Sequence, residues 1–371
     1  MGGRTVTILG SGFGLGLYIP CLLAERRFSE KGVRAEVLIF ENLISRDNRE
    51  SIIKSSKASH KNFSYAKISG KMSVDMSKSI EPDLVRALLD SWVQDNRQDF
   101  IILSGHWVYV LDEYRSRIAP NTLNAEILYI DCELPPSWKN LRHHKPEYNR
   151  NYHEKWMFDY QNSKIQYQLP VSSTSPIPFD KRPERFLLHG GGWGIGTYMD
   201  KIPELHKRGL KLDIVVHDME EASNRVDGDR YFMIDPSWRA WNKREKSCFG
   251  FPPFGEIKYP EKPIFEIKDN YHNLFAVTQN ARAIIGKTGA GTLIDSLASG
   301  TPIIMLEPVG EHEEKNLLLW ERLGFGITYN QWETDNFSMD LLRQLHINLL
   351  EGRETAADYI DGYMHRNNLL K

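Results

Sequence analysis

Apolar residues along this chain follow two alternating patterns. Short β-branched runs indicate strands, and between them lie segments whose apolar residues recur at helical spacing. In the first part of the chain, strands are expected at 5–9, 35–40, 100–103 and 126–130, and helices at 18–27 and 82–94. Because strands that alternate with helices are joined by right-handed crossovers, the pattern predicts a parallel sheet and the α/β class.

The same pattern starts again after residue 183. Residues 162–183 are rich in Pro, Ser and Gln and lack periodicity, which is typical of a linker. Beyond them, strands are expected at 185–188, 211–216, 283–285 and 302–306, and helices at 198–208, 273–280, 291–299, 315–323, 339–350 and 355–367. Since 371 residues also exceed the usual size of one hydrophobic core, we expect two similar α/β halves.

Composition and charge narrow the class of protein. Hydrophobic residues make up 41% and charged residues 26%, as in soluble globular proteins, and the net charge of −2 gives no basic field for nucleic acid. The three cysteines are too widely spaced for a disulfide framework or a zinc site. Glycines interrupt the apolar N-terminal stretch, unlike a signal peptide, and no apolar run could span a bilayer. We expect a cytoplasmic protein with at most peripheral membrane contact.

Two glycine-rich turns each follow a strand and precede a helix. The first is Gly10-Ser-Gly-Phe-Gly-Leu-Gly16, and taken alone it could bind a dinucleotide, with Glu41 after the next strand on the ribose. The second, His189-Gly-Gly-Gly-Trp-Gly-Ile-Gly196, opens the second half, and a one-cofactor dehydrogenase does not account for it. Its N–H groups could hold a diphosphate at the helix dipole, or its glycines could merely allow a close strand–helix contact.

A third motif covers residues 284–316. It combines the turn Gly286-Lys-Thr-Gly-Ala-Gly291, a helix start with a hydroxyl and a carboxylate, a Gly-x-Pro entry to the next strand, and a polar loop that opens another helix. This segment resembles the donor-binding segment of inverting GT-B glycosyltransferases. Those relatives include plant-type UDP-glycosyltransferases and the N-acetylglucosaminyltransferase that acts on lipid-linked peptidoglycan precursors.

The resemblance implies an α/β protein of the GT-B type, in which two Rossmann-like domains with parallel sheets face each other across a cleft. Residues 1–165 would form an N-terminal acceptor-binding domain, 166–183 a linker and 184–350 a nucleotide-sugar-binding domain. Residues 351–371 would form a C-terminal helix that packs back on the N-terminal domain.

The resemblance also implies roles for individual residues. On the donor side, the diphosphate would lie by Gly191, Gly192 and Gly194, and the nucleotide pocket would be lined by Lys287, Thr288, Gly289, Gly291 and Thr292. Asp295 would bind the ribose, and His312 and Glu313 would bind the sugar hydroxyls. Asn316 matches an Asn that follows this pair in the family. On the acceptor side lie Gly12, Phe13, Gly14 and Leu17. Each position also has an ordinary reading: Asp295 could form a capping box with Thr292, and Glu313 could belong to a solvated first turn.

The general base is the point at which this sequence departs from the family. Leu17 stands where the first loop of many relatives carries a catalytic His, and leucine cannot accept a proton. The best substitute is His106, which follows the strand 100–103, because loops beyond the carboxyl ends of parallel strands face the cleft. Asp131 and Glu133, after the next strand, could orient His106 or act as base themselves; the ordinary reading of His106 is a loop histidine bonded to the backbone.

These features predict an inverting hexosyl- or N-acetylhexosaminyltransferase. It would move a sugar from a UDP- or dTDP-sugar to a hydroxyl or amine acceptor by direct displacement, without a metal or a further cofactor. Two alternatives remain open: a GT-B nucleotide-sugar 2-epimerase, and a catalytically silent sugar-nucleotide-binding subunit, which Leu17 would explain.

Overall fold

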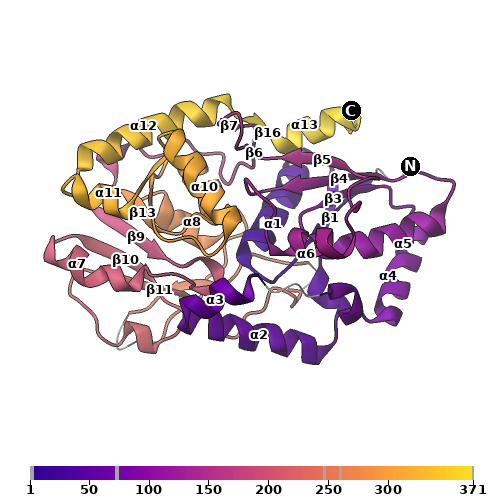
Figure 1. The fold of residues 1–371 in the computed structure, drawn as a ribbon, viewed down its shortest axis with the longest axis horizontal. Coiled ribbons are helices and arrows are strands. Elements are labelled where there is room, and N and C mark those ends of the chain that lie inside the picture. Colours follow the sequence, from indigo (N-terminus) through magenta and orange to yellow (C-terminus); the bar gives the residue numbers. More distant parts are fainter. Residues whose placement is uncertain (1–3, 72–74, 245–247, 259–260, 370–371) are drawn as a thin grey trace.

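The computed structural model describes residues 4–71, 75–244, 248–258 and 261–369, which are arranged around two separate sheets (Figure 1). The first sheet is five-stranded, with the order β2-β1-β3-β4-β5, and all its strands are parallel. Its strands are β1 (Thr5–Gly10), β2 (Arg34–Ile39), β3 (Asp99–Ile102), β4 (Asn124–Tyr129) and β5 (His153–Trp156). This sheet and its helices are called the N-terminal half.

The helices of the N-terminal half include several that the sequence pattern did not predict. They are α1 (Leu15–Glu30), α2 (Arg46–Lys61), α3 (Phe63–Ser69), α4 (Pro82–Gln94), α5 (Val108–Ile118) and α6 (Pro136–His144). The predicted helices at 18–27 and 82–94 are confirmed as α1 and α4. The pattern missed α2, a polar helix of which Ser59 is the one buried residue. Such a helix has no apolar stripe for periodicity to detect.

The second sheet has seven strands in the order β12-β11-β10-β9-β13-β14-β15, and only β12 runs antiparallel to its neighbour. The strands are β9 (Arg185–His189), β10 (Lys211–Val215), β11 (Arg230–Ile234), β12 (Phe254–Glu256), β13 (Ala283–Gly286), β14 (Ile303–Met305) and β15 (Gly326–Thr328). The helices of this C-terminal half are α7 (Ile202–Lys207), α8 (Asn273–Thr278), α9 (Ala290–Ser299), α10 (Glu311–Arg322) and α11 (Tyr329–Thr334). The helix expected at 198–208 is shorter, because residues 199–201 form a 3₁₀ turn.

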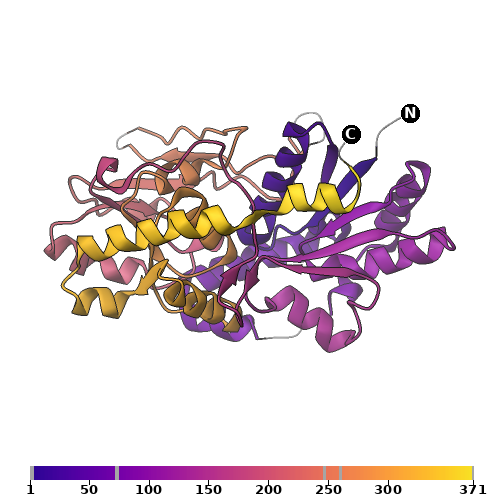
Figure 2. The same ribbon diagram turned by 90° about the horizontal axis from the view of Figure 1, so that it is seen from above.

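The end of the chain returns to the N-terminal half. Helix α12 (Met339–Thr355) runs along the C-terminal half, and α13 (Tyr359–Arg366) continues it onto the N-terminal half (Figure 2). There the Tyr359 hydroxyl donates to Glu126 at 2.7 Å, and Arg366 pairs with the same carboxylate at 2.9 Å. Short strands complete the fold: β6 (Phe158–Asp159) pairs with β7 (Lys164–Ile165), and β8 (Tyr167–Gln168) with β16 (Ala357–Asp358).

One helix from each half meets the other near its N-terminal end. Helices α1 and α9 pack together, and a Cβ built on Gly16 would lie 3.9 Å from the backbone nitrogen of Gly291. One apolar cluster extends through this contact, with Ile8 and Leu22 on one side and Leu187 and Leu293 on the other. The interface is therefore part of the hydrophobic core, and it sets the glycine turns of both halves opposite each other.

Candidate active site

A cavity of about 650 Å³ lies between the two halves. Each sheet has a topological switch point, at which the chain order of the strands runs outward in opposite directions. It lies between β1 and β3 in the first sheet and between β9 and β13 in the second. The loops that follow these four strands supply much of the cavity lining. Ligands of open α/β sheets bind at such switch points, beyond the carboxyl ends of the strands.

The second glycine turn is shaped by its own backbone and by its neighbours. Gly191 and Gly194 have φ values of 71° and 61°, which favour glycine. A Cβ on Gly192 would lie 2.5 Å from the Leu15 side chain of the facing helix. Gly191 and Gly192 line the cavity, whereas the carbonyl of Gly194 turns toward His60.

Helix α9 presents its N-terminus to the cavity. The helix begins after Gly289 without a side-chain cap, which leaves its first N–H groups available to an anion. Lys287, Gly289, Gly291, Thr292 and Asp295 all line the cavity, as the donor-site prediction requires of them. The capping-box alternative is wrong, because Thr292 and Asp295 both lie inside the helix.

Asp295 is held by a histidine that the sequence did not single out. His272 Nε2 lies 3.0 Å from Asp295 Oδ1, and both side chains are buried and line the cavity. The sequence gives little indication of this role, since His272 belongs to no recognised motif and only precedes the short helix α8. The pair leaves the second oxygen of Asp295 as the one available to a ligand hydroxyl.

Glu313 is buried at the donor side of the cavity rather than solvated. Its Oε1 accepts from Lys287 Nζ at 2.7 Å and its Oε2 accepts from the Val309 N–H at 2.8 Å. Burial opposes ionisation, but the charges of Lys287 and His312 and these hydrogen bonds lower the pKa of Glu313. His312 lines the cavity beside it. The lysine charge near the glycine turns is therefore balanced by a carboxylate before any ligand binds.

Thr288 and Asn316 bind protein groups. The Thr288 hydroxyl donates to the Glu313 carbonyl at 2.6 Å. The Asn316 side chain donates to Asp131 Oδ1 at 2.7 Å and to the Thr288 carbonyl at 2.8 Å, and it accepts from the Cys132 N–H at 2.8 Å. Asn316 thus ties the loop after β4 to the loop after β13, and it joins the two halves next to Asp131, which lines the cavity.

His106 stands on the opposite side, in a 3₁₀ turn after β3. Its neighbour Trp107 donates to the Gly10 carbonyl at 2.7 Å, which fixes this turn against the first glycine turn. The imidazole lies between the rings of Phe13 and Phe40, with centroid distances of 5.1 and 4.9 Å. Burial lowers the pKa of His106 to about 4, and its Nδ1 has no hydrogen-bond partner among the described residues. The ring lines the cavity as a neutral base.

The two carboxylates that follow β4 lie in different environments. Asp131 is buried and lines the cavity, and burial raises its pKa, against the opposing influence of His312 and Asn316. Glu133 is paired with Lys315 and accepts from the Leu134 N–H at 2.9 Å. The structure brings His106 and Asp131 to the cavity, and it engages Glu133 in an ion pair beside it.

The first glycine turn lies on the acceptor side of the cavity. Phe13, Gly14 and Leu17 line the cavity, and the Gly12 N–H donates to Glu41 at 2.8 Å. Glu41 also accepts from the Ser11 hydroxyl at 2.8 Å and is fully buried. Both oxygens of Glu41 therefore hold the turn and do not face the cavity as a ribose-binding carboxylate would. This geometry counts against the dinucleotide alternative.

No protein-family model matches the chain, and no curated protein matches it. Solved structures do match over nearly its whole length. MurG of Acinetobacter baumannii aligns over 97% of this chain and 98% of its own, with a TM-score of 0.55 and 11% identity. The chain has the GT-B fold.

Two other GT-B structures match to a similar degree. A UDP-glucosyltransferase from Polygonum tinctorium covers 96% of this chain and 94% of its own, with a TM-score of 0.56 and 11% identity. The spinosyn rhamnosyltransferase SpnG, complexed with thymidine diphosphate, covers 98% and 99%, with a TM-score of 0.54 and 11% identity. The predicted fold is thereby confirmed, whereas the predicted residue roles stay predictions. In the described part of the chain, no helix is both long and apolar enough to cross a membrane.

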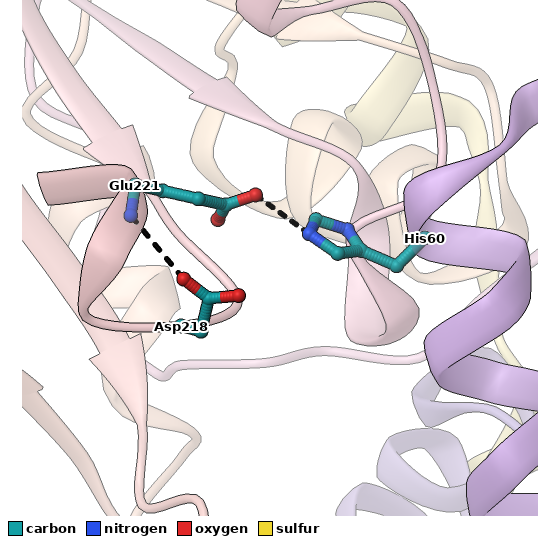
Figure 3. Close-up of side chains that lie close together, drawn as sticks. All are labelled: His60, Asp218 and Glu221. Atoms are coloured by element: carbon teal, nitrogen blue, oxygen red, sulfur yellow. Dashed lines mark hydrogen bonds and ion pairs between the residues drawn. The ribbon is translucent and has the colours of Figure 1, made fainter.

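One cluster of possible metal ligands joins the two halves of the GT-B fold. His60 of α2 points toward Glu221 and Asp218, which belong to the loop after β10 (Figure 3). His60 Nε2 lies 2.6 Å from Glu221 Oε1, and His60 Nδ1 lies 2.8 Å from the Gly194 carbonyl oxygen. Since both ring nitrogens face oxygen acceptors, the imidazolium form of His60 can donate to both of them without a metal ion.

Proposed function

We propose that this protein is an inverting glycosyltransferase that moves a sugar from a UDP- or dTDP-sugar to a hydroxyl or amine acceptor by direct displacement. One observation carries the proposal. The cavity is lined by a neutral buried imidazole, His106, from the N-terminal half, and by the second glycine turn and the uncapped N-terminus of α9 from the C-terminal half. A base on one side and anion-binding N–H groups on the other are what a displacement of diphosphate needs.

The donor would lie against the C-terminal half. The diphosphate would bind the N–H groups of Gly191 and Gly192 and of the first turn of α9, near Lys287. Asp295 would accept from the ribose hydroxyls, and His312 and Glu313 would face the sugar. Uridine and thymidine are the nucleosides of the proposed donors, in keeping with the UDP-glucosyltransferase and the thymidine diphosphate complex that share this fold.

In the proposed reaction, His106 takes the proton of the acceptor hydroxyl or amine as the acceptor atom attacks the anomeric carbon. The bond from that carbon to the diphosphate oxygen breaks, and the diphosphate leaves with the electron pair. Backbone N–H groups and the α9 dipole then stabilise its negative charge. Asp131, with its raised pKa, is the second candidate base, while the ion pair of Glu133 with Lys315 favours a structural role.

Binding and turnover test separate parts of the proposal. Native-state ligands raise stability, so UDP, dTDP, UDP-glucose and dTDP-glucose should raise the melting temperature more than NAD or AMP does. Turnover should require an acceptor and should be unchanged by EDTA. If UDP-N-acetylglucosamine is converted without an acceptor, an epimerase replaces the transferase. If uracil and thymine nucleotides do not bind, the proposed donor site is wrong.

A further inference from the structure

Helix α2 presents a row of hydroxyl groups to the cavity. Ser51, Ser55 and Ser59 line it together with Asn48, at a spacing of three to four residues that places all of them on one helix face. None of the three serine hydroxyls hydrogen-bonds to a described residue. A row of hydroxyls without protein partners can donate to and accept from a bound molecule.

The opposite face of α2 carries the cations of the helix. Arg46, Lys54, Lys57 and Lys61 are exposed, Arg49 is half-buried, and none of the five is among the residues that line the cavity. A basic helix therefore forms this wall, yet its charges point to solvent and its hydroxyls point inward. This arrangement of side chains on α2 keeps positive charge away from a molecule bound in the cavity.

The rest of the acceptor side is similarly poor in charge. Of the described lining residues in the N-terminal half, only His106 and Asp131 can titrate, and none is a lysine or an arginine. Lys287 enters the cavity from the C-terminal half and is already paired with Glu313. An acceptor phosphate or carboxylate on this side would lose water without gaining a counter-charge, and it would approach Asp131.

Much of the remaining surface on this side is apolar, although Ser69, Ser79, Ser137 and Asn140 also line it. Its apolar residues include Leu17, Ile44, Ile52, Met76, Pro135 and Pro136. Leu17 occupies the position at which a histidine was expected, so this wall is more apolar than the family pattern implies. Such a surface gains free energy by covering the apolar body of a ligand.

We propose that the acceptor is an uncharged, largely apolar molecule whose hydroxyl or carbonyl groups hydrogen-bond to Ser51, Ser55 and Ser59. This inference rests on the proposed glycosyl transfer and narrows its acceptor class. It predicts weaker binding of phosphate- and diphosphate-linked acceptors, for which the described lining of this wall supplies no cation. The serines act as specificity-determining residues, while His106 and Asp131 remain the groups near the reacting atoms.

Matched pairs of probes test the charge rule without any transfer step. Calorimetric titration at pH 6.5 would compare 4-methylumbelliferone with its phosphate, and farnesol with farnesyl diphosphate, in the presence of UDP. The uncharged member of each pair should bind at least tenfold more tightly. The inference would be overturned if the phosphorylated probes bound as tightly as the uncharged ones or more tightly. It would also be overturned if none of the four probes bound.

Variants of α2 locate the effect. The double variant Ser51→Ala and Ser55→Ala should weaken binding of 4-methylumbelliferone severalfold, whereas Ser56→Ala on the same helix, outside the lining, should not. Ser55→Lys should increase affinity for the phosphate by placing a cation in the cavity. Unchanged affinities in both cavity variants would refute the role of α2. Binding is measured apart from turnover. If the uncharged probes bind tightly but no sugar is transferred to them, the result would therefore count against the proposed glycosyltransferase activity and not against the acceptor class.

Discussion

His60 and Glu221 form an ion pair that ties the acceptor side of the cavity to the donor side, with 2.6 Å between His60 Nε2 and Glu221 Oε1. The pair lies beside the second glycine turn, because His60 Nδ1 also contacts the Gly194 carbonyl oxygen at 2.8 Å. The hydrogen bond to Glu221 raises the pKa of His60. The ring of His217 lies 4.5 Å away, and burial together with the charge on His60 lowers the pKa of His217.

The contact between the halves should therefore weaken as pH rises. A histidine whose folded-state pKa is raised contributes its full stability below the unfolded pKa of about 6.5 and loses it as pH rises through the folded pKa. Glu221 and Asp218 favour the charged form of His60, while burial opposes it. We expect His60→Gln to cost on the order of 1 kcal/mol at pH 6, after allowance for solvent screening, and less at pH 9.

Urea denaturation at the two pH values measures this difference. The exposed histidine at position 153 provides the matched control, and His153→Gln should change stability little at either pH. A cost of His60→Gln that stays constant from pH 6 to pH 9 would show that the imidazolium is not the form that joins the halves.

The base is tested by the pH dependence of turnover. Because burial lowers the pKa of His106 to about 4, the imidazole is a free base at all higher pH values, so kcat/KM should stay level from pH 8 down to about 5.5. His106→Ala should lower kcat by about 10²–10⁴-fold with little change in donor affinity. If turnover of that variant is near normal and Asp131→Asn abolishes it, the carboxyl is the base.

Local signals in the sequence predicted much of the framework but little of the pairing between halves. Most strands of the two main sheets, both glycine turns and helix α4 have signals that are local in the chain, and the sequence pattern predicted them. It missed four strands of these sheets, namely β5, β11, β12 and β15. His60 and Glu221 are 161 residues apart and lie in elements without an apolar stripe. The serines of α2 carried no signal, because a polar helix looks the same whether its hydroxyls face a cavity or the solvent.

The same distinction applies to Asn316. Its motif position was apparent from the sequence, but its partners come from loops after two other strands, so its contacts required the structure. Asn316→Ala should destabilise the protein by about 3 kcal/mol or more, since each buried polar group left without a partner costs about 1–3 kcal/mol. Urea denaturation measures this. Lys315→Ala, one residue away, breaks a half-exposed ion pair and should cost less than about 1 kcal/mol.

The close approach of Gly192 to Leu15 predicts a rescue. The backbone of Gly192 is outside the left-handed region, so alanine is prevented there by the Leu15 side chain, whose nearest atoms would lie 2.5–2.9 Å from the new Cβ. Gly192→Ala alone should cost about 1–3 kcal/mol, as overpacking does. In a Leu15→Ala background the same change should cost less, because the contacts with Cγ and Cδ1 are removed, although the Cβ of residue 15 still lies 2.8 Å from the added methyl. Thermal denaturation of the four proteins of this double-mutant cycle measures the coupling between the two sites. Strictly additive effects would mean that the glycine turn and α1 do not touch, and that the donor loop is held by the C-terminal half alone.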